Sequence, residues 1–224
     1  MSDERDTADE CFHDRTGSRW DEVNQERSEE AYDAYDLYRE HYEQAVKEFT
    51  IERLQSYYLA HPDLAVQANR SLLYAQSLKP SFPEAAFVFA AIATELAVKT
   101  VLLKPIIFGL VHTEDLASLI ADLIVRQTGF DNFHKLLNEV SFRFGGIDFK
   151  VFKRTDSAKL LWNEIKEVVS DRNSVVHRGK MSDSKNVDLA FAVAETLLNE
   201  IFPRILTKLE LHLDASMTIC AQTD

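Results

Sequence analysis

The sequence predicts an all-α protein, chiefly from its composition. Only 6 Gly and 5 Pro occur in 224 residues, which is few for the many turns of an all-β fold. Ala, Leu, Glu and Lys, which favour helices, are plentiful. Apolar residues make up 46% of the chain, enough to build a packed core. We therefore expect a helical bundle.

The N-terminal segment carries most of the net charge. Residues 1–20 lack periodicity and predict a disordered acidic tail. Residues 21–58 predict an acidic helix with an aromatic stripe, made by Tyr32, Tyr35, Tyr38 and Tyr42. Residues 1–48 hold 16 acidic and 6 basic side chains, a net of −10 out of −12.

Such a segment repels nucleic acid, because phosphate is also negative. We expect the tyrosine stripe to pack on the protein body or on a protein partner.

Residues 59–213 predict the main helical domain, followed by a flexible tail over residues 214–224. The expected helices span about residues 62–78, 83–103, 113–126, 130–140, 157–177 and 182–213, with a loop at 141–157. Pro105 is expected to bend or restart the chain, and Pro203 to kink the last helix. Gly179 is expected to end the helix before it.

The most apolar stretch predicts core helices and not a membrane span. It runs from Phe82 to Val111 and contains Glu95, Lys99 and Lys104, which are costly to place in a bilayer. The N-terminus is acidic and has no apolar run, so no signal peptide is expected. We therefore expect a cytoplasmic protein that does not enter a membrane.

One predicted helix carries the candidate chemistry. Its end reads Asp-Arg172-Asn173-Ser-Val-Val-His177-Arg178-Gly. Asn173 and His177 are four residues apart and share a helix face. Arg172 lies about 140° round the helix from His177, but its long side chain could still reach the same site. A histidine at a helix end can act as a general acid or base.

This segment resembles the HEPN superfamily (higher eukaryotes and prokaryotes nucleotide-binding domains). The family signature is an Arg, four to six residues, then a His, often with Asn directly after the Arg. Arg172-Asn173-Ser-Val-Val-His177 fits that pattern. The family also carries an earlier Ala-rich helix with Glu and Lys four residues apart, which Glu95 and Lys99 match. The resemblance covers about residues 50–212.

The resemblance implies a HEPN-like bundle and a metal-independent RNA endonuclease without a cofactor. Two protomers would meet through the motif helices and form a homodimer with one shared RNA site. His177 would act as acid or base, Arg172 would clamp the phosphate, and Asn173 would orient the His or bind phosphate. Arg178 would add positive charge. The ribose 2′-hydroxyl would attack in cis and leave 2′,3′-cyclic phosphate ends, as in toxins and antiphage effectors. The acidic segment over residues 1–48 could then dock an antitoxin or cover the site as an acidic mimic of RNA, and removing it would raise RNA binding or cleavage.

Several alternatives stay open. Glu95 and Lys99 could form an ordinary ion pair within one helix, or Glu95 could orient Arg172 or His177. Arg172 and His177 could instead cap carbonyls or pair with Asp171 or Glu167, as in a catalytically inactive dimerisation or binding module. A small-ligand sensor would need a closed apolar pocket near Glu95.

The sequence predicts neither the tyrosine modification of some HEPN toxins nor a metal site. Some HEPN toxins carry a modified Tyr two residues after the His, but Gly179 stands there in this sequence. The histidines show no metal-ligand spacing, so no metal site is predicted.

Overall fold

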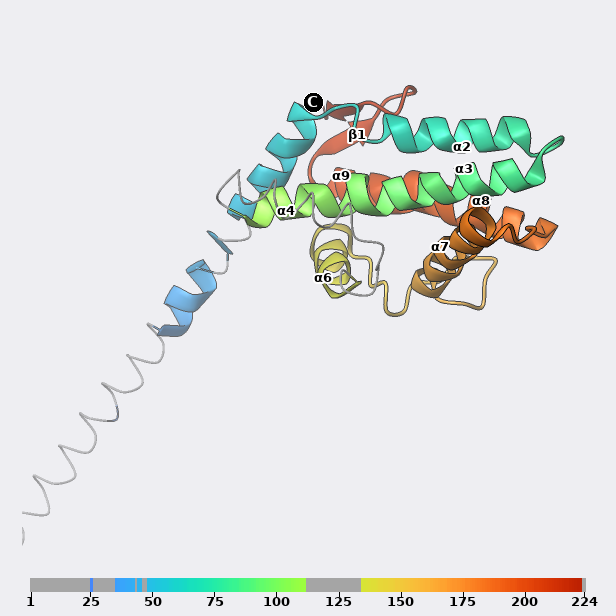
Figure 1. Cartoon of the computed structure of the whole chain (residues 1–224). Coiled ribbons are helices and arrows are strands. Elements are labelled where there is room, and N and C mark those ends of the chain that lie inside the picture. Colours follow the sequence, from blue (N-terminus) through green and yellow to red (C-terminus); the bar gives the residue numbers. More distant parts are fainter. Residues whose placement is uncertain (1–24, 26–34, 43, 46–47, 112–133, 223–224) are drawn as a thin grey trace, which may run out of the picture. The chain divides into compact units, whose positions relative to one another are not determined.

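A computed structural model describes residues 25, 35–42, 44–45, 48–111 and 134–222 (Figure 1). The chain divides into two units, residues 1–49 and 50–224. The acidic tail expected at residues 1–20 and the helix expected at 113–126 lie outside the described residues.

In the first unit, residues 35–42 form a helix. Tyr35, Tyr38 and Tyr42 recur along this helix and have exposed side chains. The rings of Tyr38 and Tyr42 stack with their centroids 6.4 Å apart. The role of this segment in docking a partner or covering a site stays a prediction.

The second unit is mostly helical, which confirms the all-α prediction. After a helical segment at residues 50–60, its elements are α2 (Val66–Leu78), α3 (Pro83–Leu96), η1 (Ala97–Leu103), α4 (Lys104–Leu110), α6 (His134–Gly145), α7 (Leu161–Arg178), α8 (Ser184–Thr196), η2 (Leu197–Ile201), α9 (Phe202–Lys208), β1 (Leu211–Leu213) and β2 (Ile219–Ala221). Helix α3 packs against α2, α7 and α8, so it lies at the centre of the unit (Figure 1).

The helical domain begins earlier than the boundary at residue 59 that the sequence predicted. Residues 50–60 belong to the second unit, and Leu54 and Tyr58 are buried in its core. Leu54 and Tyr58 are four residues apart on one helix face, which is the spacing of a core-facing stripe.

Pro105 does not interrupt its helix, because a wider turn and a side chain compensate for it. The π-helical segment η1 directly precedes α4, and the Lys104 N–H donates to the Lys99 carbonyl, five residues back. A proline lacks the N–H that would normally bond the carbonyl four residues earlier, here Val101. The Tyr58 hydroxyl donates to that carbonyl at 3.0 Å. Burial raises the pKa of Tyr58, so the hydroxyl keeps its proton.

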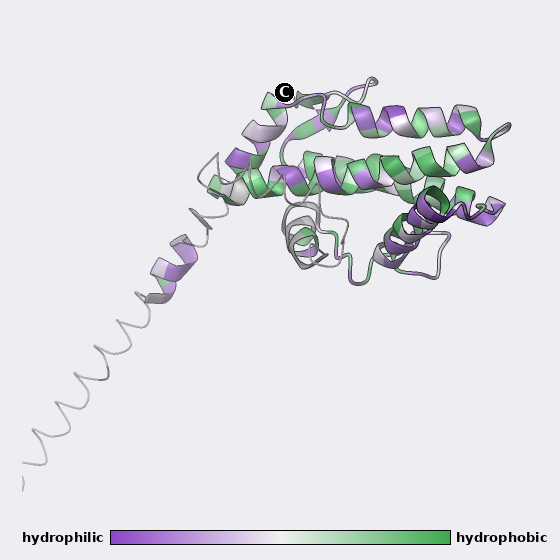
Figure 2. Cartoon of the chain, viewed as in Figure 1, coloured by the Kyte–Doolittle hydropathy of each residue, from purple (hydrophilic) through white to green (hydrophobic). Residues whose placement is uncertain are grey.

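The helix from Pro83 to Phe108 is long and apolar enough to cross a membrane, with a mean hydropathy of 1.9 in its most apolar window. Of that window, 61% is buried inside the protein. Figure 2 shows apolar residues along most of this helix, and its core neighbours cover them. The burial is typical of a core helix, as the sequence predicted.

Residues 211–221 form a β-hairpin, so the prediction of a flexible tail at residues 214–224 was wrong there. Strand β1 pairs antiparallel with β2, and Leu211 faces Ala221 in the register. Leu211 and Ile219 are buried, so the hairpin closes one end of the core. The last helix accordingly ends at Lys208 instead of Leu213. Three-residue strands are too short to leave a clear alternating pattern in the sequence.

The hairpin turn is organised by Asp214. Its Oδ1 accepts hydrogen bonds from the Ser216 hydroxyl at 2.7 Å and from the Ser216 and Thr218 N–H groups at 2.8 Å. These bonds lower the pKa of Asp214, with the Ser216 hydroxyl as the largest cause.

We expect the hairpin turn to loosen in acid. A carboxyl group whose pKa is lowered in the folded state stabilises the fold at pH values above the ordinary aspartate pKa. This stabilisation is lost as the pH falls below about 4. In an NMR titration, the signals of the Ser216 and Thr218 amides should shift together with that of the Asp214 carboxyl. This should happen at a pH below the ordinary pKa of an aspartate. A carboxyl that titrates in the ordinary range would contradict these hydrogen bonds.

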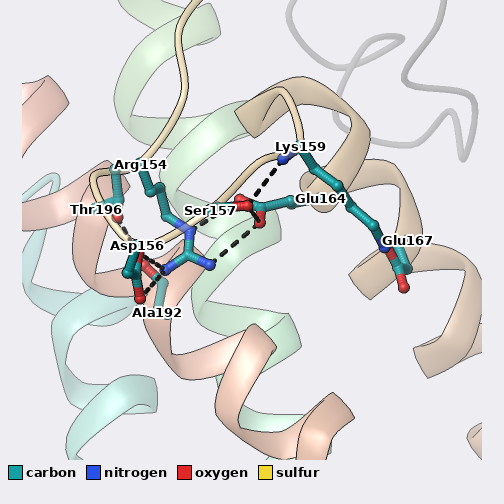
Figure 3. A network of polar contacts seen from close by, with 8 residues as sticks. All are labelled: Arg154, Asp156, Ser157, Lys159, Glu164, Glu167, Ala192 and Thr196. Carbon is teal, nitrogen blue, oxygen red and sulfur yellow. Dashed lines mark hydrogen bonds and ion pairs between the residues drawn. The ribbon is translucent and has the colours of Figure 1, made fainter.

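A buried ion pair fixes the approach to α7. Arg154 donates from Nε to Glu164 Oε2 at 2.8 Å and from Nη2 to Oε1 at 3.1 Å. The Ser157 hydroxyl adds a bond to Glu164 Oε1 at 2.6 Å, and Arg154 also contacts Asp156 (Figure 3). The hydrogen bonds that Arg154 donates to Glu164 are the largest cause of the raised pKa of Arg154. Ser157 was predicted to begin the helix, but it binds this carboxylate and α7 begins at Leu161.

Candidate active site

Helix α7 is amphipathic and places the motif at its exposed end. Its buried face packs into the core through Leu161, Trp162, Ile165, Val168 and Val169. The helix ends at Gly179, which has a left-handed backbone (φ 65°) and donates its N–H to the Val175 carbonyl. Gly179 therefore ends the helix as predicted, because glycine adopts this conformation without a steric cost.

The end of α7 lines an open cavity of about 310 Å³. Its walls are formed by Ser170, Asn173, Ser174, His177 and Arg178. His177 and Arg178 are exposed, and Asn173 is half-buried between them and the body of the helix. The structure thus brings together Asn173, His177 and Arg178, three of the residues that the sequence singled out.

Arg172 points to the other side of α7, towards α3. Its Nη2 lies 2.7 Å from Glu95 Oε1, and its Nη1 donates to Asn173 Oδ1 at 2.8 Å. Its Nε is buried and has no hydrogen-bond partner among the described residues. Arg172 is thus held by α3 and does not line the cavity.

No hydrogen bond joins Arg172 to His177 in the part of the chain that the structure describes. The rotation of about 140° between them separates their side chains, and Asn173 lies between. Asn173 accepts the bond from Arg172 and also lines the cavity with His177. The arrangement is a chain of contacts from Glu95 through Arg172 to Asn173, which ends at the cavity.

Glu95 makes both of the contacts that the sequence left open. It lies 3.6 Å from Lys99 on its own helix and 2.7 Å from Arg172 on α7. The shorter contact joins two helices, and both of its side chains are mostly buried, at 16% and 22% exposure. Glu95 therefore orients Arg172. Lys99 supports the carboxylate and does not reach the cavity wall.

Neither alternative acid holds the motif. Asp171 accepts a bond from the Asn186 side chain at 3.0 Å and lies 3.9 Å from Lys180. Glu167 pairs with Lys159 at 2.6 Å. These acids tie α7 to α8 and to the preceding loop instead of binding Arg172 or His177.

Ser170 and Ser174 were not singled out from the sequence. They line the cavity because they lie seven and three residues before His177, on the same helix face. The spacing places both serines on the face of His177, but serine is common on exposed helix faces and does not by itself indicate a functional site.

We expect Glu95→Gln to lower the free energy of unfolding by about 1–3 kcal/mol, since it leaves Arg172 with a weakened partner in a mostly buried place. Urea denaturation measures the effect. Glu200→Gln is the matched control, because Glu200 also pairs with an Arg at 2.7 Å but both side chains are exposed. Equal losses in the two variants would contradict an anchoring role for Glu95.

Within the described residues, no group of three or more His, Cys, Asp and Glu side chains could hold a metal ion. No family model matches the chain, and neither a curated protein nor a solved structure matches it. A function therefore has to be argued from the residues themselves.

Proposed function

We propose that this protein is a metal-independent RNA endonuclease of the HEPN type, working as a homodimer through α7 in the cytoplasm. The observation that carries the proposal is an exposed His177 beside Asn173 in an open cavity, with Arg172 fixed from α3 by Glu95. The setting as a toxin or antiphage effector rests on the family resemblance alone.

The reaction is a transfer within the RNA strand. The 2′-hydroxyl oxygen attacks the neighbouring phosphorus, and the bond from phosphorus to the 5′-oxygen breaks. A neutral imidazole takes the proton of the 2′-hydroxyl, and an imidazolium gives one to the leaving 5′-oxygen. The products are a 2′,3′-cyclic phosphate and a 5′-hydroxyl.

A second copy of the chain completes this chemistry. Each α7 presents one His177, whereas the reaction needs both a proton acceptor and a proton donor. Two α7 helices facing each other would supply the pair. Val176 and Met181 lie beside the cavity residues in sequence and are 51% and 73% exposed, so they are suited to an interface between copies.

Arg172 and Arg178 would have different roles at the cavity. Arg178 lines the cavity and is exposed, so it can meet a phosphate directly. Arg172 is already bound to Glu95 and Asn173. Because both of these partners occupy its guanidinium, Arg172 would act mainly by holding Asn173 in place.

The pairing of Arg172 with Glu95 also favours a second candidate, a catalytically inactive dimerisation or partner-binding module. An arginine whose charge is balanced by a carboxylate binds phosphate poorly, and the exposed Val176 and Met181 suit a protein interface.

The test is incubation of the purified protein with a mixed pool of cellular RNA in EDTA, beside a sample with Mg²⁺. The nuclease should shorten the RNA equally in both. A folded dimer that leaves all RNA intact would favour the binding module, and cleavage only with Mg²⁺ would contradict the proposed chemistry.

A further inference from the structure

A second cavity, of about 270 Å³, lies near the start of α7. Its lining combines the rings of His134, Phe149 and Trp162 with the polar side chains of Lys150, Asn163 and Lys166. None of these residues belongs to the candidate active site. The residues come from the start of α6, the loop after it and the first two turns of α7.

The rings form a fixed wall. The His134 ring stacks on Trp162 with centroids 4.5 Å apart, and Phe149 meets Trp162 edge-on at 6.3 Å. Phe149 and Trp162 are buried, which holds this wall in place. Lys150, Asn163 and Lys166 are exposed around it. The His134 ring is partly exposed, so it can meet a flat base, and the two cations and the amide beside it suit the phosphate and sugar of a nucleotide.

One face of α7 joins this cavity to the candidate active site. Lys166, Ser170, Asn173 and His177 follow at spacings of four, three and four, so they lie on one side of the helix. The first of them lines the second cavity, and the other three line the first. The face carries no carboxylate among these residues, although the whole chain has a net charge of −12.

The spacing along this face matches a short stretch of RNA. Eleven residues separate Lys166 from His177, a rise of about 16 Å along a helix. At about 3.4 Å for each stacked nucleotide, that distance corresponds to roughly five nucleotides, and to fewer in an extended strand.

We propose that the second cavity binds one nucleotide of a single-stranded RNA whose scissile phosphate lies at His177. Lys150 and Lys166 contact the phosphates, Asn163 contacts the base or sugar, and the exposed part of His134 meets the base. This inference rests on the proposed function, because it takes the strand to run from this cavity to the site of cleavage.

The test uses a labelled ten-nucleotide 2′-O-methyl RNA, which lacks the attacking hydroxyl and therefore cannot be cut. Fluorescence anisotropy measures its binding to the full chain at several salt concentrations. Lys150→Ala/Lys166→Ala should weaken binding about tenfold at low salt and reduce the salt slope by about 0.7 for each lysine removed. Lys185→Ala/Lys208→Ala is the matched control, since both lysines are exposed and line neither cavity.

Equal binding by the two double variants would overturn the proposal, and so would a wild type that does not bind the probe. Cleavage of ordinary RNA, measured separately, reports on the nuclease. A protein that binds through Lys150 and Lys166 but does not cut would keep the subsite and lose the nuclease. One that cuts without help from these lysines would keep the nuclease and lose the subsite.

Discussion

His177→Ala is expected to lower the rate of RNA cleavage by about 10²–10⁴-fold, which is the usual contribution of a positioned acid or base. The imidazole lines the cavity beside Asn173 and is exposed, so its loss removes the proton transfer and leaves the core untouched. Initial rates on a labelled RNA oligonucleotide in EDTA measure the effect.

The fold provides the control for this variant. His212→Ala removes another exposed histidine, on β1 and not lining the cavity, and should leave the rate unchanged. Both variants should have a free energy of unfolding within about 0.5 kcal/mol of the wild type, as is usual for surface substitutions. Full cleavage by His177→Ala would show that the acid or base is another group.

Glu164→Ala is expected to lower the free energy of unfolding by about 3–5 kcal/mol, which is typical of removing one partner from a buried ion pair. The Glu164 side chain is only 2% exposed and Arg154 only 10%. Glu164 also accepts a hydrogen bond from the Ser157 hydroxyl (Figure 3). Removing the carboxylate leaves a charged guanidinium without its main partner at the start of α7. Urea denaturation measures the loss.

Glu167→Ala is the matched control, three residues further along α7. Glu167 pairs with Lys159 at 2.6 Å, but the two side chains are 37% and 59% exposed, so the urea midpoint should hardly move. An equal loss in both variants would mean that burial does not decide the effect. Arg154→Met/Glu164→Leu should recover much of the stability, because it removes both buried charges together.

Much of the helical domain was predictable from local signals. Pro83 at the start of α3, Asp183 before α8 and Gly179 after α7 all lie at helix ends. These residues act within one helical turn, and for that reason a sequence is enough to place them.

The remaining features depend on partners distant in the sequence. The helix passes through Pro105 because Tyr58, 43 residues earlier than its acceptor Val101, bonds the carbonyl left open. Before α7, Arg154 and Ser157 both donate to Glu164, so Ser157 lies in the preceding loop and the helix begins at Leu161. The hairpin of β1 and β2 depends on the burial of Leu211 and Ile219 against the rest of the domain.

The candidate site was predictable in its residues but not in their directions. The spacing placed Asn173 and His177 on one face, and both line the cavity. Arg172 was expected in the same place, but Glu95 on α3 holds it on another side of the helix. The second cavity left no signal, since His134, Lys150 and Lys166 are far apart in the sequence.

Analysis of the RNA ends produced by the wild type in EDTA tests the central claim most directly. The proposed attack by the 2′-hydroxyl predicts fragments with 2′,3′-cyclic phosphate and 5′-hydroxyl ends. Fragments that carry 5′-phosphates, or an absence of cleavage by a folded dimer, would contradict a nuclease centred on His177.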